Sequence, residues 1–142
     1  MKNTTEAITV ETTVHSSIEE VWKIWTTASH IMNWNNPSDD WHSPNSFIDL
    51  KEGGHFSFRM EAKDGSVGFD HKGVYDKVKV RELIEYTVAD GRKSVIQFIP
   101  NGNETRIIET FEPEPETPID MQRDFCQAVL NNFKQYAEQQ IS

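Results

Sequence analysis

The stretch GGHFSFRMEAKDGSVGFDHKGVY, residues 53–75, decides the fold. Its two arms alternate aromatic or aliphatic residues with polar ones, as strands do, and Asp64-Gly65 between them favours a tight hairpin turn. If these two residues close the turn, antiparallel pairing fixes the register of the whole hairpin. The expected cross-strand pairs are Phe58 with His71, Arg59 with Asp70, and Met60 with Phe69.

Alternation gives the hairpin an apolar face and a polar face. The apolar face, which should meet the core, contains Phe56, Phe58, Met60, Phe69, His71 and Tyr75. The polar face, which should meet water, contains Ser57, Arg59, Glu61, Asp70 and Lys72. On that face Arg59 and Asp70 should form an exposed ion pair that contributes ~0.2–1 kcal/mol. A catalytic cluster of Arg59, Glu61 and Asp70 is the alternative, but ion pairing already explains these charges.

Turn signals and hydrophobic periodicity extend this pattern along the chain. Strands are expected at 6–14, 45–50, 55–62, 67–79, 82–89, 93–99 and 104–112. A helix capped by Ser16 or Ser17 and a short helix at 28–34 should follow the first strand, and a loop should cover 35–43. The apolar stripe of a long helix, 119–140, contains Met121, Phe125, Val129, Phe133 and Tyr136.

These elements predict a single α+β domain over residues 1–142. About seven antiparallel strands would form a curved sheet wrapped on the long C-terminal helix, because an open sheet cannot bury its inner face on itself.

Charge and composition limit the partners. The net charge of −9 disfavours nucleic acid and anionic membrane surfaces. Cys126 is the only cysteine, so no intrachain disulfide can form. No apolar run reaches the length of a membrane span, and the N-terminus lacks an apolar signal core, so a cytoplasmic location and no membrane insertion are expected.

Two groups of residues are candidates for a site. His71 and Tyr75 are the polar exceptions on the apolar face, so they either find partners in the core or point into a cavity towards a ligand. In the 35–43 loop, a carboxylate of the stretch Asp39-Asp40-Trp41-His42 and the His could act as a general base and its orienting partner, or these could be ordinary turn residues. Trp34 and Trp41, which flank this loop, are expected at a cavity mouth as a lid or stacking wall.

The sequence lacks the motifs that are typical of other kinds of functional site. The five His residues show no metal-ligand spacing, and nucleophile-elbow, phosphate-loop and dinucleotide motifs are absent. Cys126 is interpreted as a small buried hydrophobe. No metal, cofactor or catalytic residue is therefore expected.

A set of motifs spans almost the whole chain: Val21-Trp22-x-x-Trp25, Trp34-Asn35, Asp39 to His42, Asp49-Leu50-x-x-Gly53-Gly54-x-Phe56, Arg59 to Ser66, Gly73-x-Tyr75, Thr105-Arg106, Glu109 to Phe111, Gln122-Arg123 and Asn132-Phe133-Lys134-x-Tyr136. With the order of elements, this set resembles the START-like (SRPBCC) superfamily, whose fold is the helix grip. Within the superfamily, the chain is similar to the branch named after the activator of the heat-shock-protein-ninety ATPase.

The resemblance implies a cavity between the sheet and the last helix that holds a small apolar or amphipathic molecule. The residues expected to contact this ligand are Trp34, Trp41, His42, Phe58, Met60, Phe69, His71, Tyr75, Phe125 and Val129. Relatives often have Gly-Trp where this chain has Phe125-Cys126, so the cavity should differ in shape.

The expected function is therefore ligand binding without catalysis. One alternative is a cavity enzyme of the cyclase or hydrolase type that uses His71, Tyr75 or His42 as acid–base groups. The other is a co-chaperone-like interaction module with a chaperone partner, as the name of the branch suggests.

Overall fold

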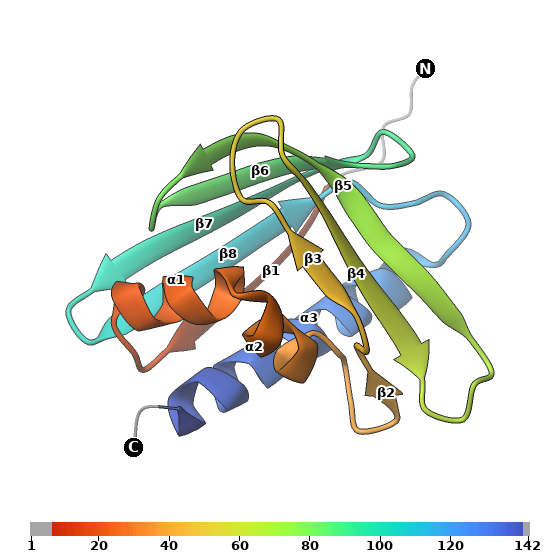
Figure 1. The fold of residues 1–142 in the computed structure, drawn as a ribbon, viewed down its shortest axis with the longest axis horizontal. Coiled ribbons are helices and arrows are strands. Elements are labelled where there is room, and N and C mark those ends of the chain that lie inside the picture. The colour runs from red at the N-terminus through yellow and green to blue at the C-terminus, as the bar shows by residue number, and fades with distance from the viewer. Residues whose placement is uncertain (1–6, 141–142) are drawn as a thin grey trace.

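The computed structural model describes residues 7–140 (Figure 1). Residue 6 of the first expected strand, and the N-terminal segment 1–6 searched above for a signal core, lie outside the described residues. The helices are α1 (Ile18–Thr26), α2 (Ala28–Trp34) and α3 (Ile119–Gln139). The strands are β1 (Ile8–Val14), β2 (Trp41–His42), β3 (Ser46–Ile48), β4 (His55–Ala62), β5 (Gly68–Lys79), β6 (Leu83–Val88), β7 (Lys93–Asn101) and β8 (Glu104–Phe111).

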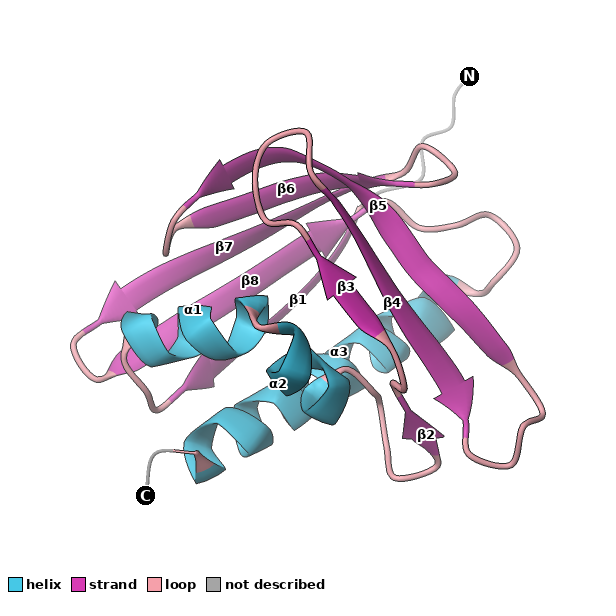
Figure 2. Cartoon of the chain, in the orientation of Figure 1, coloured by secondary structure: helices cyan, strands magenta, loops and turns pink. Residues whose placement is uncertain are grey.

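The strands form one antiparallel sheet in the order β1-β8-β7-β6-β5-β4-β2, and β3 also pairs with β4. The sheet curls, and all three helices lie on its inner side (Figure 2). The predicted helix-grip architecture, with two short helices after the first strand, is confirmed. Within residues 7–140, no helix is long and apolar enough to cross a membrane.

One strand lies where the sequence predicted only loop. Trp41 and His42 pair with Ala62 and Glu61 at the end of β4, and so form β2. Two residues are too few to show alternation, so only the tertiary pairing with β4 reveals this strand.

The hairpin formed by β4 and β5 has the predicted register. Phe58 pairs with His71, and Met60 pairs with Phe69. In the turn, Gly65 has a φ of 78°, which glycine adopts without steric cost, and the Ser66 amide donates to the Asp64 carboxylate over 2.8 Å. The local turn chemistry therefore sets the pairing.

The two faces of the hairpin also lie as predicted. Phe56, Met60 and Tyr75 are buried on the inner face. On the outer face, Arg59 forms the expected ion pair with Asp70 at 3.5 Å and a closer one with Glu61 at 2.8 Å. These charges neutralise one another at the surface, as the ion-pair interpretation requires.

The core joins the grip helix to the two short helices. Phe133 of α3 is fully buried, and its ring centroid lies 4.8 Å from those of Trp25 and Trp34. Asn132, its neighbour, donates to the Trp34 carbonyl over 2.9 Å. The inner end of the sheet–helix space is therefore closed by aromatic side chains.

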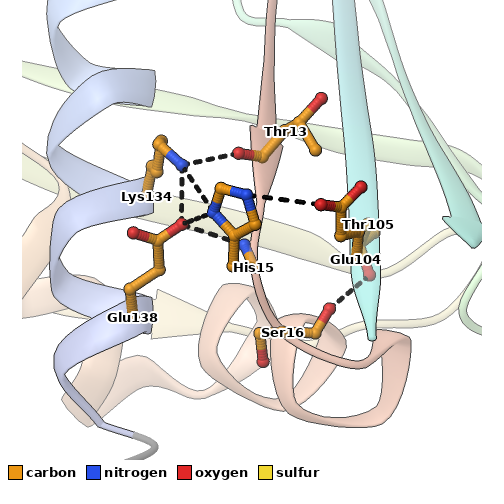
Figure 3. A network of polar contacts seen from close by, with 7 residues as sticks. All are labelled: Thr13, His15, Ser16, Glu104, Thr105, Lys134 and Glu138. Carbon is orange, nitrogen blue, oxygen red and sulfur yellow. Dashed lines mark hydrogen bonds and ion pairs between the residues drawn. The ribbon is translucent and has the colours of Figure 1, made fainter. Parts of the chain in front are cut away.

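A polar network fastens the far end of α3 to the sheet (Figure 3). Glu138 accepts hydrogen bonds from Lys134 at 2.6 Å and from the His15 amide at 2.9 Å, and His15 also lies 3.3 Å from Glu104 of β8. Partial burial alone would raise the pKa of Glu138, but these hydrogen bonds outweigh burial and lower the pKa to about 2. Because Glu138 then stays ionised at neutral pH, the network holds α3 in position along β1.

Candidate functional site

A cleft of about 510 Å³ opens between α3 and the inner face of the sheet. This volume lies in the range of roughly 300–1,000 Å³ that is typical of sites for small molecules. Its lining is mostly apolar and comes from β4 to β8, the connector before α3, and α3 itself. The residues of α3 that line it are Met121, Gln122, Phe125, Cys126 and Val129.

A smaller cavity of about 80 Å³ adjoins the cleft at its inner end. Five residues line both spaces: Asn35, His71, Tyr86, Glu109 and Val129. The two spaces therefore meet at a group of polar side chains between apolar walls. This arrangement suits a molecule with an apolar body and a polar group.

Eight of the ten expected ligand contacts line one or both spaces. The eight residues are Trp34, Phe58, Met60, Phe69, His71, Tyr75, Phe125 and Val129. Phe125 and Cys126 both form part of the cleft wall. The inner hairpin face and the stripe on α3 therefore meet across one cleft.

Trp41 and His42 do not line either space. The Trp41 ring packs behind two residues of the cleft wall, 6.1 Å from Phe69 and 5.8 Å from Phe125 between ring centroids. His42 Nε2 lies 3.4 Å from Glu61, on the polar face of β4. Their places follow from the pairing of β2 with the edge of β4, so these two expectations are corrected.

Trp34 was expected at the cavity mouth but lies in the core. Only 4% of its surface is exposed, and its Nε1 donates to the Ile24 carbonyl over 3.1 Å. It touches only the inner cavity. Packing of α2 on α3 turns this ring inwards, so the prediction that Trp34 lies at the cavity mouth was wrong.

The most unusual group in the cleft is Glu109 of β8, which was not among the predicted contacts. Its neighbours at alternate positions, Thr105 and Ile107, are fully buried, so the strand directs the carboxyl inwards. Burial raises its pKa to about 7, and in the described part of the chain no hydrogen bond or cation offsets this effect. Ile107 and Ile108 are adjacent apolar residues, so strand alternation in the sequence did not single out Glu109.

Three other titratable groups that line the cleft, those of His71, Tyr86 and Cys126, are uncharged at neutral pH. Burial, assisted by the positive charge of Arg92, lowers the pKa of His71 to about 4. His71 Nε2 lies 3.4 Å from the Tyr86 hydroxyl, whose pKa is raised by burial and then by Glu109. Burial also raises the pKa of the Cys126 thiol, so this thiol is not an activated nucleophile.

A second unsatisfied polar group is the Asn35 side chain at the C-terminus of α2. The residue is 9% exposed, and its Nδ2 has no hydrogen-bond partner among the described residues. Buried polar groups without partners are costly and uncommon. Asn35 Nδ2 and the Glu109 carboxyl are therefore a donor and an acceptor without partners, on two residues that line the same space.

The outer rim of the cleft is polar and ordered. Gln122 of α3 donates to the carbonyls of Glu114 and Thr117 over 3.0 and 2.8 Å, which pins the connector to the helix. Arg92, which immediately precedes β7, donates to Asp90 over 2.8 Å. The polar groups at the rim thus have hydrogen-bond partners, whereas the Glu109 carboxyl and Asn35 Nδ2 in the interior have none among the described residues.

The described residues contain no group of three or more His, Cys, Asp or Glu side chains able to hold a metal ion. A single buried carboxyl that lines the same cleft as a neutral histidine can transfer a proton or bind a polar group. The geometry therefore suits recognition of an organic molecule.

The protein family described as "Activator of Hsp90 ATPase homolog 1-like protein" matches residues 15–138. Among solved structures, an AHSA1-like protein from Aeromonas hydrophila is 36% identical with a TM-score of 0.87, covering 94% of this chain and 93% of that one. A protein from Cytophaga hutchinsonii is 50% identical with a TM-score of 0.81, covering 95% and 94%. Among curated proteins, no sequence matches the chain.

At lower identity the likeness extends to the fold alone. A protein from Nitrosomonas europaea has a TM-score of 0.81 at 16% identity, covering 95% of this chain and 96% of that one. The sheet and its grip helix are thus compatible with widely different side chains.

Proposed function

Because the chain belongs to the activator of Hsp90 ATPase homolog 1-like family, with its grip helix and open cleft, we propose that it binds a small apolar or amphipathic molecule and does not transform it. The observation that carries this proposal is the 510 Å³ cleft, whose mostly apolar walls converge on a few polar groups. Burial of an alkyl or aromatic ligand there would contribute ~25 cal/mol per Å² of apolar surface removed from water.

Val129 offers a way to block the cleft, since it lines both the outer and inner spaces. Val129→Trp should fill the junction and weaken binding of the neutral lipophile N-phenyl-1-naphthylamine by about tenfold or more, the equivalent of ~1.4 kcal/mol. Fluorescence titration measures this affinity, and circular dichroism checks that the variant is folded.

The matched control is Val80→Trp, because Val80 is 58% exposed and lies outside the cleft. This variant should bind the probe as the natural protein does. Equal affinity in all three proteins, or no saturable binding in any, contradicts the proposal.

A cavity enzyme is the second candidate, because the pKa of Glu109 near 7 suits a general acid or base at neutral pH. Of the residues first considered for this role, His71 reaches the outer cleft, Tyr75 only the inner cavity and His42 neither. Mass spectrometry of lipophiles recovered from the protein after incubation with cell extract separates the two. Intact molecules support binding, and covalently altered ones support the enzyme.

A protein-interaction role is the third candidate, and it rests on the family name alone. In the same experiment, a co-purifying chaperone without any bound lipophile would favour this role over the cleft.

A further inference from the structure

The charges around the cleft are unevenly distributed. Arg92 is the single basic residue among those lining it, and its guanidinium is already paired with Asp90. The acidic residues that line the cleft are Glu109 in the interior and Glu112 and Glu114 towards the rim. The field inside the cleft therefore favours a cation and opposes an anion such as a fatty acid.

Glu109 differs from the rim carboxylates because it has no partner. The Glu112 carboxylate accepts the Lys93 amide at 2.7 Å, and Glu114 accepts the amides of Glu116 and Thr117. Burial alone raises the pKa of Glu109. An unpaired carboxyl in an apolar cleft is costly when ionised, and a ligand cation would remove that cost.

Asn35 supplies an independent observation on the same space. Its Nδ2 is a buried donor without an acceptor, and the residue lines the junction that Glu109 also lines. A ligand that carries an oxygen close to its cation would satisfy both groups at once.

We propose that the ligand is a lipophilic amine with an oxygen near its nitrogen, such as a long-chain amino alcohol. Its ammonium pairs with Glu109, its oxygen accepts from Asn35, and its chain lies along Phe125 and Val129 in the cleft. This assignment rests on the proposed ligand-binding function and specifies the chemical class of the ligand.

Three probes of equal chain length test the charge: dodecylamine, 1-dodecanol and dodecanoate, each used to displace N-phenyl-1-naphthylamine at pH 7.5. The amine should displace the probe at about tenfold lower concentration than the alcohol, as a charge-assisted hydrogen bond would give, and dodecanoate should be weakest. In Glu109→Gln the ratio between amine and alcohol should fall to about one. The control Glu52→Gln, an exposed acid outside the cleft, should keep the full ratio.

The oxygen is tested by comparing 2-(dodecylamino)ethanol with dodecylamine. The hydroxylated amine should bind about threefold more tightly or better to the natural protein, and Asn35→Ala should abolish that advantage. If the advantage is absent in the natural protein or survives in Asn35→Ala, the contact with Asn35 is wrong.

The possible failures are distinguishable. If 1-dodecanol or dodecanoate binds as tightly as the amine, or if Glu109→Gln keeps the amine's advantage, the charge assignment is overturned while the binding function stands. If N-phenyl-1-naphthylamine itself does not bind, the proposed function fails before any comparison of charge is made.

Discussion

Replacing Phe133 with alanine should lower the free energy of unfolding by about 3–5 kcal/mol, the range for a buried aromatic ring. Phe133 is fully buried on the grip helix, and its ring packs against Trp25 and Trp34. The substitution would leave a void that this aromatic cluster cannot fill without moving α1 and α2. Urea unfolding measures the loss.

Met121→Ala is the matched control on the same helix, because Met121 is 61% exposed. It should cost less than about 0.5 kcal/mol, the level of a surface substitution. A loss below ~1 kcal/mol for Phe133→Ala would place this ring outside the core and contradict the grip of the sheet on α3.

Replacing Glu109 with glutamine should stabilise the protein above about pH 4.5, where the glutamate of the unfolded chain ionises, and most strongly above pH 7. Burial raises the pKa of Glu109 from 4.5 to about 7 in the folded protein. Between these values the folded state holds a proton that the unfolded state has released. The natural protein therefore loses stability as pH rises through this window, and the loss is complete above pH 7.

Glutamine does not titrate, so the variant should escape this loss. Since each pKa unit corresponds to ~1.36 kcal/mol, the variant should be more stable than the natural protein by up to roughly 3 kcal/mol at pH 8. At pH 4 the two proteins should be nearly equal. Urea unfolding at both pH values checks this. If the two proteins differ in stability by the same amount at pH 4 and at pH 8, burial does not shift the pKa of the Glu109 carboxyl. A gain in stability that accompanies weaker binding of amines is the trade-off expected of a functional site.

The fold could be predicted from the sequence because its signals are local. Asp64-Gly65 specifies the turn that sets the hairpin register, and the stripe that contains Phe133 marks the helix. The same alternation correctly placed His71 and Met60 on the inner face. Such features depend on neighbours along the chain, so the sequence displays them directly.

The site could be predicted only in part because its remaining features depend on tertiary packing. In β8, Ile107 and Ile108 are consecutive apolar residues. Alternation alone therefore does not show which face of the strand points inwards, or whether Glu109 lies on that face. The pairing of β8 with β1 and β7 settles it. The positions of Trp34 and Trp41 likewise depend on how α2 meets α3 and how β2 meets β4.

The central claim, that the cleft between the sheet and α3 holds an amphipathic molecule, is tested most directly by intermolecular nuclear Overhauser effects in a methyl-labelled sample with 1-dodecanol. This neutral probe keeps the test independent of the charge assignment. Effects from the alkyl chain should reach the methyl groups of Val129 and Met60, which line the cleft. Effects confined to Val80 and Ile99, which are exposed and do not line the cleft, or no effects at all, would contradict the account.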